Sequence, residues 1–372
     1  MSTPDITTQV ALNTPPSEAT PVPLLAIKAL TKRFITRRNW LAKPTRVVHA
    51  LRGVSLEVYP AEALGIVGES GCGKSTLARA ILQLDRPDSG SMIWQASNDA
   101  YPLHLEKLKG KALKRWRPEC QMVFQNPYAS LNPRLTIAQT LTEPLSVHHR
   151  GKNHQERRHQ AITLLQQVGL SEEAMAKYPH AFSGGQRQRI GIARALALKP
   201  KLLVADEPVS ALDVSIQAQI LNLFKQLQQE HDIALLFVAH NLDVVRYLCD
   251  RVAVMYLGQI VELAPTEKLF TQPMHPYTQT LLEARPIADP DLKDRHKASS
   301  KNGLAKINQE PASALSPPAG CAFHPRCDYA VERCLTESPS LTSYPSQGNV
   351  HAHVACHRAH EWPQGLGTAP KI

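Results

Sequence analysis

The order of apolar and polar positions along the chain predicts an α/β fold. Short apolar runs at residues 63–67, 120–124, 201–206 and 233–239 are bounded by glycine, proline or polar residues, as is typical of buried strands. Residues 214–227 instead carry apolar side chains at three- and four-residue spacing, which indicates a helix with one buried face. Strands that alternate with helices favour a sheet whose faces are covered by helices.

Three further segments extend this core. Residues 24–34 and 51–58 alternate between apolar and polar positions, which predicts an antiparallel β part. Residues 127–184 are polar with helical spacing, so we expect a helical subdomain inserted between two core strands. Residues 252–263 contain two apolar runs separated at Gly258 and predict a hairpin at the edge of the sheet.

The two ends of the chain differ in composition from its core. Residues 1–23 are rich in Thr and Pro and have no hydrophobic period, so we expect a disordered tail before a folded domain at residues 24–265. Residues 266–310 predict a helix followed by a polar linker. Residues 311–372 form a cysteine-rich C-terminal extension.

Composition and charge limit the class of protein. No apolar run approaches 18 residues, and the N-terminus lacks the basic start and apolar segment of a secretory signal, so we expect neither a membrane-spanning nor an exported chain. Seven cysteines in 372 residues are too few and too scattered for a disulfide framework. The net charge of +10 favours an acidic partner, which could be a nucleotide, a nucleic acid or an anionic membrane surface.

A glycine-rich segment between the strand at 63–67 and a predicted helix at 77–82 is the strongest chemical signal. Glycines allow backbone N–H groups to turn toward an anion, and the start of the helix adds its positive dipole end. The Lys74 ammonium would reach the β- and γ-phosphates, and the Ser75 hydroxyl would bind Mg²⁺. We therefore expect a nucleoside triphosphate to contact Gly68, Glu69, Ser70, Gly71, Cys72, Gly73, Lys74, Ser75 and Thr76.

Polar side chains stand at the ends of three predicted strands. Asp206 and Glu207 end a buried strand, where ligands collect in open α/β sheets, so Asp206 would hold Mg²⁺ and Glu207 would act as general base. Gln125 ends another strand just before Asn-Pro, which suits a polar sensor. His240 follows a third strand and is either a hydrogen-bonded structural residue or a catalytic partner; its position, comparable with that of Glu207, favours catalysis.

A second candidate anion site opens the helix after Phe182. Ser183 is the expected N-cap, and Gly184, Gly185 and Gln186 follow it, so free backbone N–H groups are again available. A chain with one nucleotide pocket has no obvious need for two such sites.

These motifs, in this order, resemble the nucleotide-binding subunit of an ABC transporter over essentially all of residues 24–263. The resemblance implies a P-loop ATPase core with a mixed sheet and flanking helices. It also implies that Phe34 stacks on adenine, that Gln125 contacts Mg²⁺ together with Ser75 and Asp206, and that His240 faces the γ-phosphate. Two such domains would pair head to tail, so that one signature segment acts on the ATP of the other domain; its residues are Ser183, Gly184, Gly185, Gln186 and Asp213.

Within that family, residues 126–134 and 274–282 resemble the ATPases of bacterial dipeptide and oligopeptide importers, most closely the dipeptide permease type. The resemblance implies a peripheral location on the cytoplasmic face of the inner membrane. The implied partners are a second ATPase subunit, two transmembrane permease subunits contacted by residues 128–134, and an extracytoplasmic peptide-binding protein. We expect a heterodimer of ATPase subunits, although a homodimer stays open. Nickel and antimicrobial-peptide uptake systems share these features.

Two other classes of function are disfavoured. A soluble ABC ATPase acting on nucleic acid would fit the positive charge, but such proteins usually carry two cassettes or a long coiled coil, so we expect no nucleic-acid partner. A regulatory ATP binder would require a broken catalytic site, and the presence of Glu207 and His240 argues against it.

The C-terminal extension contains four cysteines, which resemble the tail of the same subfamily: Cys321, Cys327, Cys334 and Cys356. They could bind a [4Fe–4S] cluster, as the resemblance suggests for some members, or zinc with help from His324 or His357. Their spacing matches neither the usual ferredoxin pattern nor paired CxxC motifs, so a cluster, zinc and no metal all stay open.

Overall fold

The computed structural model describes residues 22–38, 44–96, 101–284, 312–344, 352–362 and 365–366. Residues 1–21 of the predicted disordered tail and residues 285–310 of the predicted linker lie outside these ranges.

The centre of the molecule is a mixed sheet with the strand order β11-β12-β10-β9-β3-β8-β7-β6. Five of these strands, β9, β3, β8, β7 and β6, are parallel, and β10, β12 and β11 continue the sheet in antiparallel pairs. Their bounds are β3 Ala63–Val67, β6 Cys120–Val123, β7 Leu202–Asp206, β8 Ala234–Val238, β9 Arg251–Tyr256, β10 Gln259–Pro265, β11 Thr342–Tyr344 and β12 Ala352–Val354.

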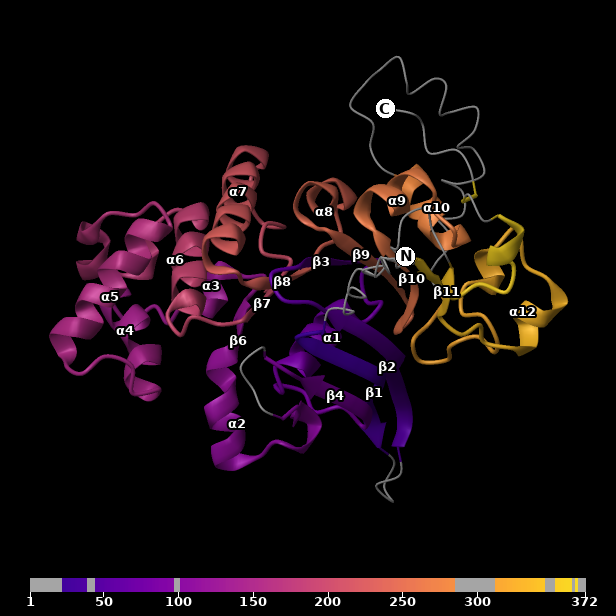
Figure 1. Ribbon diagram of the computed structural model, residues 1–372, viewed down its shortest axis with the longest axis horizontal. Helices are drawn as coiled ribbons and strands as arrows, with labels where there is room; N and C mark the ends of the chain where they lie inside the picture. Colours follow the sequence, from indigo (N-terminus) through magenta and orange to yellow (C-terminus); the bar gives the residue numbers. More distant parts are fainter. Residues whose placement is uncertain are drawn as a thin grey trace, which may run out of the picture.

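The parallel strands are continuous apolar runs because both faces of the sheet are covered. In β8, Leu235 and Phe237 belong to one buried cluster, whereas Ala234, Leu236 and Val238 belong to the cluster on the opposite face. Helices α7 Val214–His231, α8 Leu242–Leu248, α9 Thr266–Thr271 and α10 Pro276–Glu283 lie on one side of this sheet (Figure 1). The chain therefore builds the layered core that its hydrophobic pattern predicts.

The opposite side of the central sheet carries α1 Lys74–Ile81 and a second, antiparallel sheet of order β2-β1-β4-β5 (Figure 1). The strands are β1 Leu25–Arg38, β2 Pro44–Val58, β4 Ser89–Trp94 and β5 Leu103–His104. Trp94 is fully buried and meets Trp116, at the end of α2 Gly110–Trp116, edge to face at 5.7 Å. This contact ties the antiparallel sheet to the segment that leads into β6.

A group of helices separates β6 from β7 in the sequence and lies beside the sheet (Figure 1). These helices are α3 Pro127–Ser130, α4 Ile137–Val147, α5 His154–Gln167 and α6 Gly184–Leu196. Helix α5 buries Ala161, Leu164 and Leu165 on one face, and Gly169, with a positive φ of 74°, follows its end. Among the described helices, none combines the length and the apolar character that crossing a bilayer requires.

The C-terminal region completes the sheet, so the predicted edge position of the hairpin β9–β10 is wrong. Strand β12 pairs with β10 through Glu262 opposite Val354, and β11 pairs in turn with β12. Ala352 and Val354 are both fully buried, which explains why so short a strand is held here. The buried Glu262 carboxylate accepts hydrogen bonds from the N–H groups of Met274 (2.8 Å) and His275 (2.9 Å), and burial raises its pKa to about 7.

Candidate active site

The glycine-rich loop connects β3 to α1 and needs glycine for steric reasons. At Gly68 a Cβ atom would lie 2.1 Å from the carbonyl oxygen of Met255, and at Gly73 it would lie 2.4 Å from that of Ala50. Both glycines also have positive φ angles, 153° and 109°. The loop can therefore keep this close approach to its neighbours only with glycine at these two positions.

Lys74 places a buried positive charge inside the loop. Its side chain is 4% exposed, and Nζ donates hydrogen bonds to the carbonyl oxygens of Gly68 (2.8 Å) and Glu69 (3.0 Å). The N-terminus of α1 begins at the same residue and adds free N–H groups. The loop thus brings together a positive charge and free N–H donors, which are the groups that bind a phosphate.

Ser75 and Asp206 come together at the carboxyl end of β7. The Ser75 hydroxyl donates a hydrogen bond of 3.0 Å to Oδ1 of Asp206. Burial raises the pKa of Asp206, and the bond from Ser75 opposes that rise. A hydroxyl oxygen and a carboxylate beside a phosphate-binding loop are hard oxygen donors of the kind that Mg²⁺ prefers, so this pair fits the cation.

Glu207, Gln125 and His240 meet where three neighbouring strands end. Nε2 of Gln125 donates a hydrogen bond of 3.0 Å to Oε2 of Glu207, and Nδ1 of His240 lies 3.5 Å from the same oxygen. The three residues follow β7, β6 and β8, which are adjacent in the sheet. The structure thus brings together three side chains that are widely separated in sequence.

The backbone of Glu207 has an unusual conformation. Its φ of 45° is left-handed, although the residue carries a side chain, and its N–H donates a hydrogen bond of 3.0 Å to the carbonyl oxygen of Val238. Such a conformation is costly and is found mostly where the surrounding structure needs the side chain aimed in one direction. Here it turns the carboxylate away from the buried strand and toward Gln125 and His240.

Ser183 caps α6 in a reciprocal arrangement. Its hydroxyl accepts a hydrogen bond from the N–H of Gln186 (3.3 Å), whose side-chain oxygen accepts one from the N–H of Ser183 (3.0 Å). Asp213 caps α7 by accepting from the N–H of Ile216 (3.0 Å), and this bond lowers the pKa of Asp213. Gly185 allows the two helix starts to touch, because a Cβ there would lie 2.5 Å from Cγ2 of Ile216.

The two candidate anion sites of one chain belong to different parts of the molecule. Helix α6 packs against α3, α4, α5, α7 and β6, whereas α1 packs against β2, β7 and β8 (Figure 1). Among the hydrogen bonds of the described residues, none joins residues 183–186 to the phosphate loop. Phe34 lies on β1, in the antiparallel sheet; its ring is 36% exposed, with Lys32 Nζ 5.3 Å from the ring centroid.

The four C-terminal cysteines lie near one another. Burial raises the pKa of the Cys327 thiol to about 12 and that of Cys356 to about 11, and in both cases the neighbouring cysteines add to the rise. Within the described ranges, however, no group of three or more His, Cys, Asp or Glu side chains is placed to hold a metal ion. The positions of the thiols therefore do not fit a formed [4Fe–4S] or zinc site.

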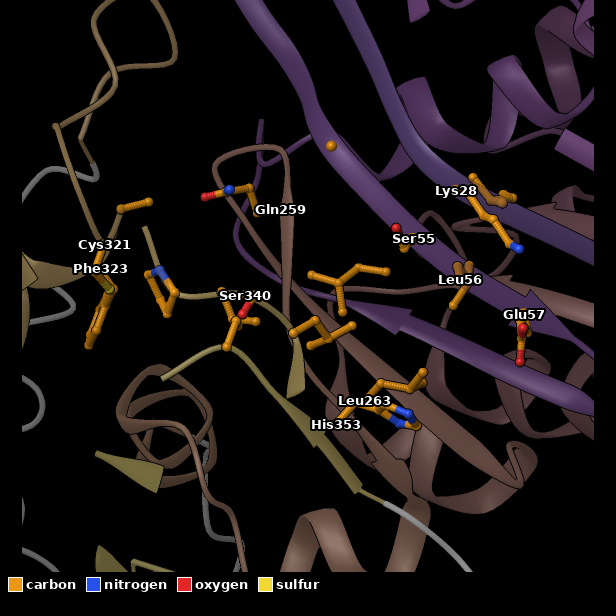
Figure 2. Close-up of a pocket in the computed structure, with 18 of the residues that line it drawn as sticks. Lys28, Ser55, Leu56, Glu57, Gln259, Leu263, Cys321, Phe323, Ser340 and His353 are labelled. Carbon is orange, nitrogen blue, oxygen red and sulfur yellow. The ribbon is translucent and has the colours of Figure 1, made fainter. Parts of the chain in front are cut away.

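A cleft of about 580 Å³ lies between the antiparallel sheet, β10 and the C-terminal region. Figure 2 shows Cys321 and Phe323 on one side of it, and Lys28, Ser55 and Glu57 on the other. None of the predicted nucleotide residues lines this cleft. It is therefore separate from the site formed by the strand ends.

Sequence reasoning missed two residues that contact the phosphate loop. The hydroxyl of Tyr277 accepts a hydrogen bond from the N–H of Glu69 (2.9 Å), and the Arg326 guanidinium binds the Glu69 carboxylate. Tyr277 lies within residues 274–282, and Arg326 lies between Cys321 and Cys327 of the C-terminal extension, two segments whose sequence resembles the importer subfamily. Nothing in their local pattern pointed to the loop, because the contacts span more than 200 residues of chain.

Comparisons with known proteins agree with this geometry. Residues 51–210 match the family model for ABC transporters, and residues 261–334 match the model for the C-terminal region of oligopeptide/dipeptide transporters. A probable peptide ABC transporter ATP-binding protein of Sinorhizobium fredii is 48% identical over 331 residues, covering 89% of this chain and 90% of the relative. The di/tripeptide transport ATP-binding protein DppF of Pseudomonas aeruginosa is 46% identical over 342 residues, covering 91% and 98%.

The fold is also similar to a solved structure. An ATP-binding cassette in a dimeric post-hydrolysis state, bound to ADP and Pi, superposes with a TM-score of 0.57 at 30% sequence identity. The match covers 65% of this chain and 98% of that cassette.

Proposed function

The chain belongs to the ABC transporter family of ATPases, and we propose that it is the ATP-hydrolysing subunit that powers import of dipeptides or oligopeptides through the bacterial inner membrane. The observation that carries this proposal is the meeting of Gln125, Glu207 and His240 beside the Ser75–Asp206 pair. The peptide substrate is supported by the match of residues 261–334 and by the printed names of the relatives.

In the proposed reaction the phosphate loop binds the triphosphate through its backbone N–H groups and Lys74, and Phe34 stacks on the adenine. Ser75, Asp206 and Gln125 would hold Mg²⁺, which neutralises charge on the β- and γ-phosphates. Glu207 accepts a proton from the attacking water, and Gln125 holds its carboxylate in place. His240, whose Nδ1 lies 3.5 Å from Oε2 of Glu207, would face the γ-phosphate from the neighbouring strand end.

We propose that the second anion site works between two subunits. Ser183, Gly185 and Asp213 of one ATPase subunit would close on the ATP held by the phosphate loop of the other subunit. ATP would then bridge the two subunits, and hydrolysis would release them. The partners we propose are a second ATPase subunit, forming a heterodimer, two transmembrane permease subunits and, through the permeases, an extracytoplasmic peptide-binding protein. The ATPase subunits would lie at the cytoplasmic face of the inner membrane.

The transported substrate can be tested on the assembled transporter, purified with its permeases and reconstituted with its binding protein. We expect dipeptides or short oligopeptides to stimulate ATP turnover and to enter the vesicles. If nickel or an antimicrobial peptide stimulated turnover and short peptides did not, that compound would be the transported substrate. The role of the chain as a transport ATPase would be unchanged. ATP turnover stimulated only by nucleic acid would contradict the transport role.

A metal centre at the four cysteines is a separate proposal, supported by the nearness of their thiols and not by a formed ligand geometry. We propose that they bind a [4Fe–4S] cluster once their side chains rearrange. Protein purified without oxygen should then be brown and contain iron and sulfide in equal amounts. Cys327→Ser should remove the colour, whereas Cys249→Ser, a buried cysteine of the core cluster, should keep it. Colourless wild-type protein, with or without zinc, would contradict the cluster.

A further inference from the structure

Glu69 in the phosphate loop is held through each of its polar groups. Its N–H donates to the hydroxyl of Tyr277 (2.9 Å), and its carbonyl oxygen accepts from Nζ of Lys74 (3.0 Å). Its carboxylate accepts two hydrogen bonds from the Arg326 guanidinium, one from each terminal nitrogen, at 3.0 and 2.9 Å. Two of these three partners come from the region after residue 265, outside the conventional ATPase core.

The ion pair between Arg326 and Glu69 is buried and has the two-pronged geometry of the strong guanidinium–carboxylate pairs. The side chain of Arg326 is only 3% exposed and that of Glu69 is 19% exposed. Burial lowers the pKa of Arg326, but the hydrogen bonds and the charge of Glu69 outweigh this effect and raise it. Such pairs differ from surface ion pairs, which contribute little, because loss of one partner leaves a buried charge without compensation.

An aromatic cluster fixes the position of the guanidinium. The ring of Phe323, on the turn just before Arg326, lies 5.3 Å from the ring of Tyr277 and 5.4 Å from that of Tyr256. All three rings are almost fully buried. The Arg326 guanidinium lies 5.7 Å from the Phe323 ring and 5.9 Å from the Tyr256 ring. Tyr256 ends β9, the neighbour of β3, so this cluster joins the C-terminal region to the strand that leads into the phosphate loop.

A displacement of Glu69 would also displace the Lys74 ammonium, which is the positive charge proposed to bind the phosphates. The same residue whose carboxylate binds Arg326 provides a carbonyl acceptor for the Lys74 ammonium. We propose that Arg326 and Tyr277 are positioning residues of the nucleotide site, which act through Glu69 to hold the phosphate loop in the geometry that binds ATP. The C-terminal region of this chain therefore sets its affinity for ATP. This inference rests on the ATP-binding role proposed above. It adds that contacts from the C-terminal region determine how tightly the chain binds ATP.

The test measures the ATP dissociation constant of the isolated full chain, and KM and kcat in the assembled transporter. Arg326→Met should raise the dissociation constant and KM about tenfold or more and change kcat less than about twofold, because it removes a buried charge partner without touching the catalytic residues. Arg326→Lys, which keeps the charge but not the two-pronged geometry, should fall between this variant and the wild type. Tyr277→Phe, which keeps the buried ring, should also raise KM.

A double-mutant cycle separates positioning from general destabilisation. If Arg326 acts through Glu69, adding Glu69→Gln to Arg326→Met should weaken ATP binding no further, whereas independent effects would multiply. Arg333→Met is the matched control, since Arg333 lies in the same region and pairs with Glu337 at the surface, with both side chains more than half exposed. It should leave KM unchanged.

Unchanged ATP affinity and KM in a folded Arg326→Met variant would overturn the inference. If that variant does not fold, unchanged KM in both Arg326→Lys and Tyr277→Phe would do so. A wild-type chain that binds no ATP would instead contradict the proposed function itself, so the two failures are distinguishable.

Discussion

Replacing Glu207 with glutamine is expected to lower ATP turnover by about 100- to 10,000-fold while ATP binding is kept, because positioned general bases contribute rate factors of that size. Glutamine has nearly the same shape as glutamate and can still accept the hydrogen bond that Gln125 now donates to Oε2. It cannot accept a proton from water. The variant should therefore bind ATP and accumulate as a closed dimer, measured by steady-state phosphate release and by ATP-dependent association of the ATPase subunits.

Glu119→Gln provides the matched control for this change. Glu119 lies at the opposite end of β6 and forms an ion pair with Lys201 at 3.3 Å, so the same substitution removes a charge near the same strands but far from the proposed chemistry. It should leave turnover within about twofold, because partly exposed ion pairs contribute little. If Glu207→Gln hydrolysed ATP about as fast as Glu119→Gln, the general base would have to be another residue.

The central sheet could be predicted from the sequence because its parallel strands are buried on both faces. Their apolar runs are continuous, and each ends in a turn or polar residue, so β3, β7 and β8 can be located from composition alone. The grouping of Gln125, Glu207 and His240 follows from the same logic, since residues that end adjacent parallel strands must share one edge of the sheet.

The contribution of the C-terminal region could not be predicted in this way. Strands β11 and β12 have three residues each, which is too short for a readable period, and β12 pairs with a strand about 90 residues earlier in the chain. The bond from Arg326 to Glu69 spans 257 residues. An isolated arginine between proline and cysteine reveals no partner, so only the folded chain identifies the pair.

Residues 183–186 illustrate a different limit of prediction. Their capping geometry follows from the Ser-x-x-Gln pattern and is present in the structure. In the proposed arrangement, however, their ligand is bound to another subunit, so one chain would contain only half of that site. The resemblance to a family of paired domains was needed to assign the segment a role.

Ser183→Arg is expected to reduce hydrolysis at least about 100-fold, as loss of a positioned donor to a reacting oxyanion does, without weakening ATP binding to the isolated subunit. A long cation at this exposed helix start would occupy the space proposed for the γ-phosphate of the partner site. The phosphate loop itself belongs to a different part of the chain and should be unaffected. The measurements are ATP turnover in the assembled transporter and nucleotide affinity of the single subunit.

The substitution also removes a helix cap, which costs about 1 kcal/mol of stability, so a control must remove a cap elsewhere. Asn153 caps α5 by accepting from the N–H of Glu156 (2.8 Å) and is likewise exposed, so Asn153→Arg changes charge and capping equally. It should retain hydrolysis.

Combining Ser183→Arg with Glu207→Gln should also prevent formation of the ATP-dependent closed dimer. Closed dimers that persist in that double variant, or ATP binding lost from the single subunit, would place Ser183 outside the shared site and leave the second anion site without its proposed ligand.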